Sequence, residues 1–121
     1  MRFLSVIIIS LCATLTPSPA FAGQADVIDV KYECAEACTF WVTVRHADSG
    51  WDHYADRWEI LAPDGEIIAT RVLGHPHVNE QPFTRSLGGV IIPVGISDVR
   101  IRAHDSVHGY GGEEVAVTLD K

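Results

Sequence analysis

Short alternating runs of apolar and polar residues dominate the sequence after residue 22, and they constrain its fold more than any other feature. Many of the apolar residues are β-branched or aromatic, and no window repeats them at the spacing of an amphipathic helix. Turn residues such as the Pro63-Asp64-Gly65 triplet separate the runs. We therefore expect a nearly all-β protein with strands at residues 27–32, 39–45, 56–62, 66–73, 83–92, 99–103 and 115–119. Seven short strands are typical of a single immunoglobulin-like antiparallel β-sandwich, which we place at residues 23–121.

Alternation along the second run predicts which side chains face the core. Phe40, Val42, Val44 and then His46 fall on one face of a strand, because successive side chains point to opposite sides. His46 should therefore lie at the rim of the core. We expect the buried layer between the two sheets to include Trp58, Ile60, Val42, Val44, Val99 and Ile101.

The first 22 residues have the three-part pattern of a secretory signal peptide. The stretch "MRFLSVIIISLCATLTPSPAFA" begins with one arginine, continues with an apolar run and ends with Ala20-Phe21-Ala22. We expect cleavage after Ala22 and a periplasmic or secreted protein. Cys12 lacks the small-residue cleavage pattern of a lipoprotein, and no second apolar run is long enough to span a bilayer, so no membrane anchor is expected after cleavage.

Charge and cysteine content narrow the function classes. Without Arg2 the chain carries 8 basic and 16 acidic residues, so binding to a phosphate backbone is electrostatically opposed and a nucleic-acid partner is not expected. Cys34 and Cys38 lie close together in "YECAEACTF", and export to an oxidising compartment favours a disulfide between them. The alternative is a Cys-x-x-x-Cys metal pair, as in copper-delivery proteins, but those have a thioredoxin-like βαβ pattern that this sequence lacks.

The six histidines are the candidate metal ligands. If consecutive strands run antiparallel, the loops that carry them all lie at the end of the sandwich opposite the cysteines. This arrangement requires Gly88-Gly89 to be a bulge within one strand, because a full turn there would move two histidines to the other end. Nearby acidic residues, Asp48, Asp52, Asp56, Glu80 and Asp105, can serve as further ligands or hold imidazole N–H groups. We expect a site formed first by His46, His53, His104 and His108, then by His75 and His77.

The ligand types that the chain lacks limit which metals are expected to bind. No methionine remains after residue 22 and the cysteines are expected to be oxidised, which disfavours a soft Cu(I) site and leaves Cu(II), Zn(II) or Fe(II). The alternative interpretation is that each histidine is an ordinary loop residue with a polar tip.

Two segments resemble the superoxide reductase family, which includes desulfoferrodoxin and neelaredoxin. They are "HADSGWDHYADRWEILAPDGEIIATRVL" and "AHDSVHGYGG". The family's fold is an immunoglobulin-like sandwich with iron bound by four histidines and a cysteine. The resemblance implies that His46 and His53 replace two of those histidines, His104 the cysteine and His108 the last histidine, and that the metal is redox-active. The segment "HPHVNEQPFTRSL" resembles small exported bacterial proteins of an uncharacterised family instead.

Two other function classes remain at this point. A non-catalytic periplasmic interaction or carrier-partner module could use the same end loops, with Trp51, Tyr54, Phe83 and Tyr110 as an aromatic contact surface for a protein partner. Hydrolysis by a catalytic triad is weakly supported, because no serine lies in a recognisable nucleophile motif. The sequence identifies no catalytic residue, and whether the protein is an enzyme stays open.

Overall fold

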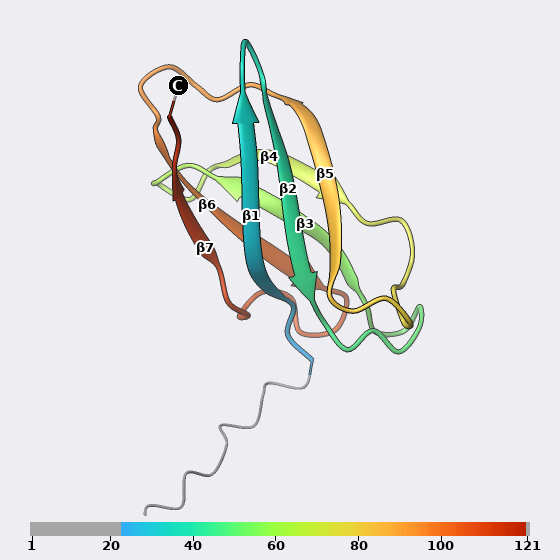
Figure 1. Ribbon diagram of the computed structural model, residues 1–121. Coiled ribbons are helices and arrows are strands. Elements are labelled where there is room, and N and C mark those ends of the chain that lie inside the picture. The colour runs from blue at the N-terminus through green and yellow to red at the C-terminus, as the bar shows by residue number, and fades with distance from the viewer. Residues whose placement is uncertain (1–22, 121) are drawn as a thin grey trace, which may run out of the picture.

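The computed structural model describes residues 23–120, which form two antiparallel sheets packed face to face (Figure 1). One sheet has the strand order β1-β2-β5 and the other β4-β3-β6-β7. The strands are β1 (Asp26–Cys34), β2 (Cys38–Arg45), β3 (Ala55–Leu61), β4 (Ile67–Val72), β5 (Phe83–Val90), β6 (Asp98–Asp105) and β7 (Val115–Thr118). The predicted all-β immunoglobulin-like sandwich of seven strands is confirmed.

The core lies between the two sheets and contains the side chains that alternation predicted. Phe40, Val42 and Val44 of β2 face inward and are fully buried, whereas Trp41 is exposed on the outer face. The opposite sheet contributes its own alternating set, so that every predicted core residue is buried: Trp58, Ile60, Val42, Val44, Val99 and Ile101. Replacing a large side chain in such a core by alanine typically costs about 2–5 kcal/mol.

The hairpin between β1 and β2 ends in the predicted disulfide. Cys34 and Cys38 are cross-strand partners, and their sulfur atoms are bonded. The pairing closes the turn between β1 and β2, at the top of Figure 1. The cysteines therefore do not belong to the end that carries the histidine loops.

Gly88 and Gly89 form a bulge, as the arrangement of the histidine loops requires. Strand β5 continues through both glycines to Val90, and its register with β2 shifts where Cys38 pairs with Val90 and Phe40 pairs with Leu87. Gly89 has a φ of 66°, a backbone conformation that glycine adopts without steric cost. Because β5 does not reverse, β6 runs toward the histidine end and delivers its last residues there (Figure 1).

The expected signal peptide, residues 1–22, lies outside the described residues. Within residues 23–120 there is no helix long and apolar enough to cross a membrane.

Candidate metal centre

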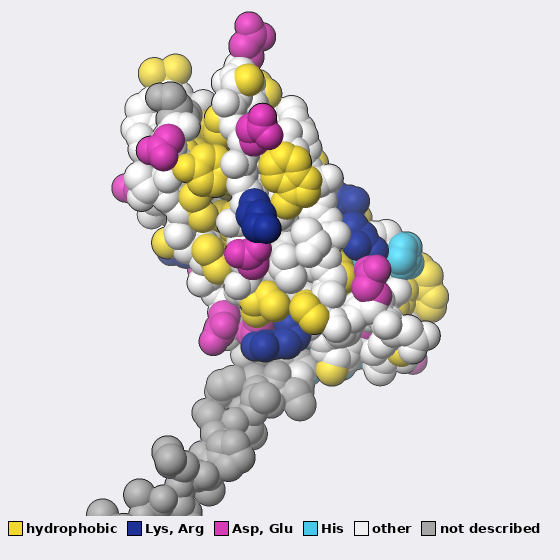
Figure 2. Space-filling model, viewed as in Figure 1, with side chains coloured by type: hydrophobic (Ala, Val, Ile, Leu, Met, Phe, Trp, Pro, Cys, Tyr) yellow, Lys and Arg dark blue, Asp and Glu magenta, His cyan; other side chains and the backbone are white. Residues whose placement is uncertain are grey.

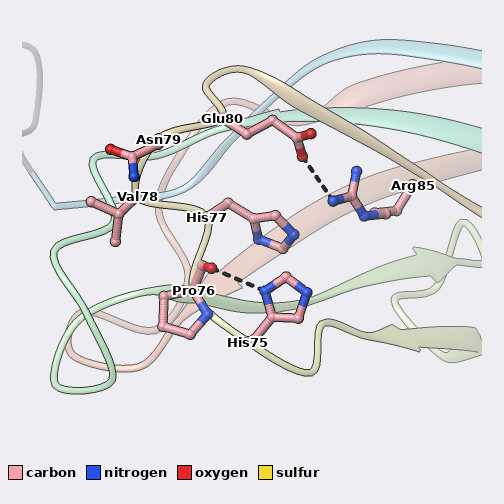
Figure 3. Close-up of a pocket in the computed structure, with 7 residues that line it drawn as sticks. All are labelled: His75, Pro76, His77, Val78, Asn79, Glu80 and Arg85. Atoms are coloured by element: carbon pink, nitrogen blue, oxygen red, sulfur yellow. Dashed lines mark hydrogen bonds and ion pairs between the residues drawn. The ribbon is translucent and has the colours of Figure 1, made fainter.

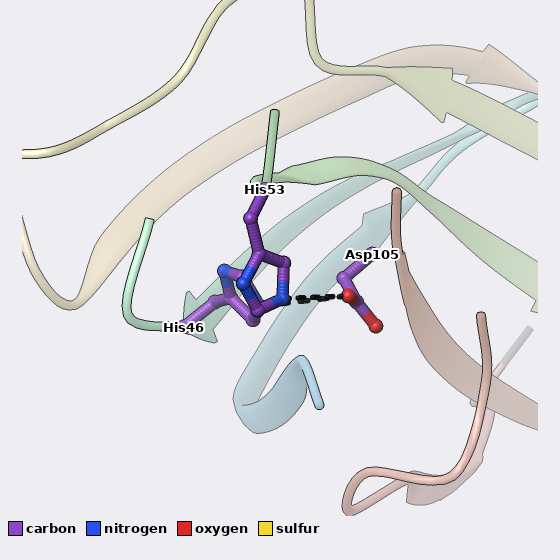
Figure 4. Close-up of side chains that lie close together, drawn as sticks. All are labelled: His46, His53 and Asp105. Atoms are coloured by element: carbon purple, nitrogen blue, oxygen red, sulfur yellow. Dashed lines mark hydrogen bonds and ion pairs between the residues drawn. The ribbon is translucent and has the colours of Figure 1, made fainter. Parts of the chain in front are cut away.

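Three histidines and one aspartate converge at the end of the sandwich opposite the disulfide. His46, His53 and Asp105 each offer one ligand atom, and these atoms all lie within 4.8 Å of one another (Figure 4). His108 joins them, because its Nδ1 lies 3.1 Å from Asp105 Oδ2. We call His46, His53, His108 and Asp105 the His/Asp cluster. The arrangement could hold a metal ion, since imidazole nitrogens and a carboxylate oxygen suit several divalent transition metals.

Strand alternation aims two members of the cluster at the interior. His46 is the next inward position after Val44 of β2, and its side chain is fully buried. Asp105 follows Ile101 and Ala103 on the inner face of β6, and its side chain is also fully buried. The two strands belong to different sheets, so the cluster lies where the core reaches the end of the sandwich.

Two tight loops supply the remaining histidines. The loop after β2 turns back at residues 50–53, where the His53 backbone N–H donates to Gly50 O at 3.2 Å. The loop after β6 closes between Asp105 and Gly109, whose backbones exchange hydrogen bonds at 3.0 and 3.1 Å. This short loop returns the His108 ring to the carboxylate three residues earlier, and the side chain stays 41% exposed. The cluster is thus closed by the core on one side and reached by solvent at His108.

Asp105 is held as a buried anion. Burial by itself raises its pKa, but the backbone N–H and ring of His108, the backbone N–H of Val107 and the charge of His46 outweigh this effect and lower the pKa below its usual value. Its Oδ2 lies 2.9 Å from His53 Nε2 as well. Oδ1 is buried and has no hydrogen-bond partner among the described residues. An ionised carboxylate with one unsatisfied oxygen is suited to a cation.

Asp48 orients the His46 ring from behind. The Asp48 carboxylate is buried and contacts His46 Nδ1 through Oδ1. It also accepts hydrogen bonds from the backbone N–H of Ala55 at 3.0 Å and of His77 at 2.7 Å. Because Nδ1 faces Asp48, Nε2 is the His46 nitrogen that faces the cluster. Carboxylate–imidazole pairs of this kind commonly orient and strengthen metal-binding histidines.

The carbonyl oxygen of Gly23 lies among the three imidazoles. It is 2.8 Å from His46 Nε2, 3.1 Å from His53 Nε2 and 3.0 Å from His108 Nδ1. Ligand atoms about 2.0–2.2 Å from one ion lie roughly 2.8–3.6 Å apart in octahedral or tetrahedral geometry. The spacing around Gly23 O therefore matches one coordination shell, although His46 Nε2 and Asp105 Oδ2 are somewhat farther apart at 3.8 Å. Sequence reasoning did not include Gly23, and its only signal was the position next to the expected cleavage site.

His104 does not join the cluster. The structure extends β6 to Asp105, so His104 lies within the strand and points to the opposite side from Asp105. Its Nδ1 is 2.6 Å from Asp56 Oδ1, and its ring packs edge-on against Tyr110 at a centroid distance of 4.8 Å. The resemblance to superoxide reductases placed His104 at the position of the thiolate ligand, and this placement is not supported by the geometry.

His75 and His77 form a separate pair in the loop between β4 and β5 (Figure 3). Their ring centroids are 4.6 Å apart, and His75 is exposed whereas His77 is buried against Phe83 in a parallel stack with centroids 4.0 Å apart. Neither ring nitrogen of His77 has a hydrogen-bond partner among the described residues. Burial, with the positive charges of Arg85 and His75, lowers the pKa of His77 below its usual value. His-Pro-His is thus a loop that packs one ring on the core.

The aromatic surface proposed for a protein partner is only partly present. Trp51 is 67% exposed and packs edge-on against Tyr54, but Phe83 is 1% exposed beneath His77, which removes it from any contact surface. On the face that Figure 2 shows, apolar side chains over sheet β1-β2-β5 are interrupted by acidic and basic ones.

Comparison with known proteins gives little functional information. No protein-family model matches the chain. The chain is similar to a protein named "Putative lipoprotein" from Halomicrobium mukohataei, with 41% identity over 99 residues. The matched part covers 80% of this chain, which spans only about half of that relative, 48% of its length. The crystal structure of the hypothetical protein PH1083 from Pyrococcus horikoshii is similar in fold, with a TM-score of 0.54 and 13% identity over 82% of this chain and 92% of that one.

Proposed function

We propose that the protein is an exported β-sandwich protein that binds one divalent transition metal ion, copper, iron or zinc, through the His/Asp cluster. The observation that carries this proposal is the convergence of three imidazole nitrogens on one buried, ionised carboxylate. Histidines that were only ordinary loop residues would have no reason to converge on one carboxylate. The Asp48 carboxylate also contacts His46 Nδ1. Metal-binding imidazoles commonly make such a contact through the nitrogen that does not bind the metal.

Two observations support export. Residues 1–22 have the pattern of a signal peptide. The name of the Halomicrobium relative also describes an exported class of protein. We therefore propose that the protein is periplasmic or secreted.

Superoxide reduction is not part of this proposal. The resemblance to that family assigns the position of the electron-donating thiolate to His104, and His104 contacts Asp56 on the other side of β6. The proposal is therefore restricted to metal binding, with His46, His53, His108 and Asp105 as ligands.

Elemental analysis with matched variants tests the proposal. Protein without a tag, purified from the periplasm, is expected to contain close to one equivalent of copper, iron or zinc. His53→Gln and His108→Gln should lose this metal, whereas the matched controls His75→Gln and His104→Gln should retain it. Failure of the purified, metal-free protein to bind any of the three ions, or equal loss in all four variants, would overturn the proposal.

A further inference from the structure

The chain's approach to the His/Asp cluster depends on glycine at position 23. Gly23 is buried, and a Cβ atom built on it would overlap the ring of His108. Any other residue would therefore displace His108 or withdraw the chain from the three imidazoles.

The loop after β6 packs directly against the residues that follow Gly23. A Cβ atom on Gly112 would overlap the carbonyl of Ala25, so the two backbones are in direct contact there. Hydrogen bonds from Val27 N–H to Glu113 O at 2.9 Å and from Glu113 N–H to Asp26 Oδ1 at 2.7 Å fix the next residues. The residues that follow Gly23 are thus anchored to the loop that carries His108 and directly follows Asp105.

We propose that removal of the signal peptide after Ala22 makes the α-amino group of Gly23 a further ligand of the metal in the His/Asp cluster. This inference rests on the proposed metal-binding function. A signal peptidase would hydrolyse the Ala22–Gly23 peptide bond with one water molecule, leaving a carboxylate on Ala22 and an amine on Gly23. Before cleavage the Gly23 nitrogen is an amide without a basic lone pair; after cleavage it is an amine that can bind a metal ion.

The position of the Gly23 carbonyl and standard backbone geometry allow this amine to reach the same ion. The nitrogen and carbonyl oxygen of one residue are separated by about 2.7–3.6 Å, depending on rotation about the Cα–C bond, given standard backbone bond lengths. Gly23 O already lies 2.8–3.1 Å from the three imidazole nitrogens. An ion held by those rings can therefore be chelated by the amine and the carbonyl of the same glycine. Processing would then complete the site only after the chain has been exported.

The test compares two secreted chains that differ at the N-terminus by one residue. The full-length chain is produced in an exporting host, and its mature N-terminus is read by intact mass and N-terminal sequencing. A variant with one serine inserted between Ala22 and Gly23 is expected to start with that serine, so that the Gly23 nitrogen is an amide. Each metal-free protein is titrated with Cu(II), Zn(II) and Fe(II).

We expect the chain that starts at Gly23 to bind at least tenfold more tightly than the serine-extended chain. Labelling glycine with ¹⁵N should also change the nitrogen coupling in the electron paramagnetic resonance spectrum of the Cu(II) form, because imidazole nitrogens are not labelled. This change should be absent from the extended chain, in which the labelled nitrogen is no longer an amine.

Three results would overturn the inference. Equal affinities, with no change in the nitrogen coupling on ¹⁵N labelling, would show that the His/Asp cluster binds the metal without the amine. A mature chain that starts at any residue other than Gly23 would remove the ligand altogether. If neither chain binds any of the three ions, the proposed function fails as well, and this outcome is distinguishable from the other two.

Discussion

His104 and Asp105 are neighbours in β6, yet their side chains enter opposite environments. Asp105 points into the sandwich, where its buried carboxylate is approached by His53, His108 and, less closely, His46. His104 points outward and meets Asp56 in a pair whose side chains are 18% and 24% exposed. Both are histidine–carboxylate contacts, but only the first gathers several rings around one desolvated anion.

The largest expected effect comes from removing the buried charge. Asp105→Asn keeps the shape of the side chain but removes its anion, so we expect metal affinity to fall by more than the roughly 10–100-fold that losing an outer contact costs. Asp56→Asn makes the same chemical change on the other side of β6 and should leave the affinity unchanged. Competition with a chelator of known affinity measures both. Similar losses in the two variants would contradict the assignment of Asp105 as the ligand.

A smaller effect is expected behind the cluster, at Asp48. Asp48→Asn places an amide where the carboxylate now accepts from the backbone N–H groups of Ala55 and His77 and contacts His46. We expect about a 10–100-fold loss of metal affinity and a decrease of about 1–3 kcal/mol in the free energy of unfolding.

The control for Asp48 lies in the same loop. Asp52 is exposed, so Asp52→Asn changes the net charge equally without disturbing a buried contact. Chemical denaturation and chelator competition on both variants would separate the local role from the general charge effect. If the two substitutions weaken binding alike, long-range charge rather than orientation of His46 is responsible.

The comparison across β6 also shows where sequence reasoning reaches its limit. Alternation in β2 predicted the burial of Val42 and Val44 and the inward position of His46, because a strand with one buried face has a strongly specified register. The same reasoning ended β6 at residue 103, so it could not assign the sides of His104 and Asp105, which depend on a two-residue extension of that strand. The place of Gly23 in the cluster could not be predicted from the sequence for another reason. Its position depends on packing against a loop more than 80 residues later.

The smallest expected effect concerns His77, whose buried ring has no carboxylate within hydrogen-bonding distance of its nitrogens. Burial is the main reason that its pKa is lowered, with Arg85 and His75 adding to the effect and Asp48 and Glu80 opposing it. Below about pH 6.5, the ordinary histidine value, the unfolded chain binds a proton at His77 more readily than the folded chain does, so stability falls as pH falls.

His77→Phe preserves a flat ring on Phe83 and removes the group that takes up this proton. We therefore expect the variant to gain stability relative to the parent between pH 7.5 and pH 5, measured by denaturant unfolding at both values. His75→Gln, on the exposed partner ring, should give a smaller change, and a parent-to-variant difference independent of pH would show that His77 protonates equally in the folded and unfolded chains.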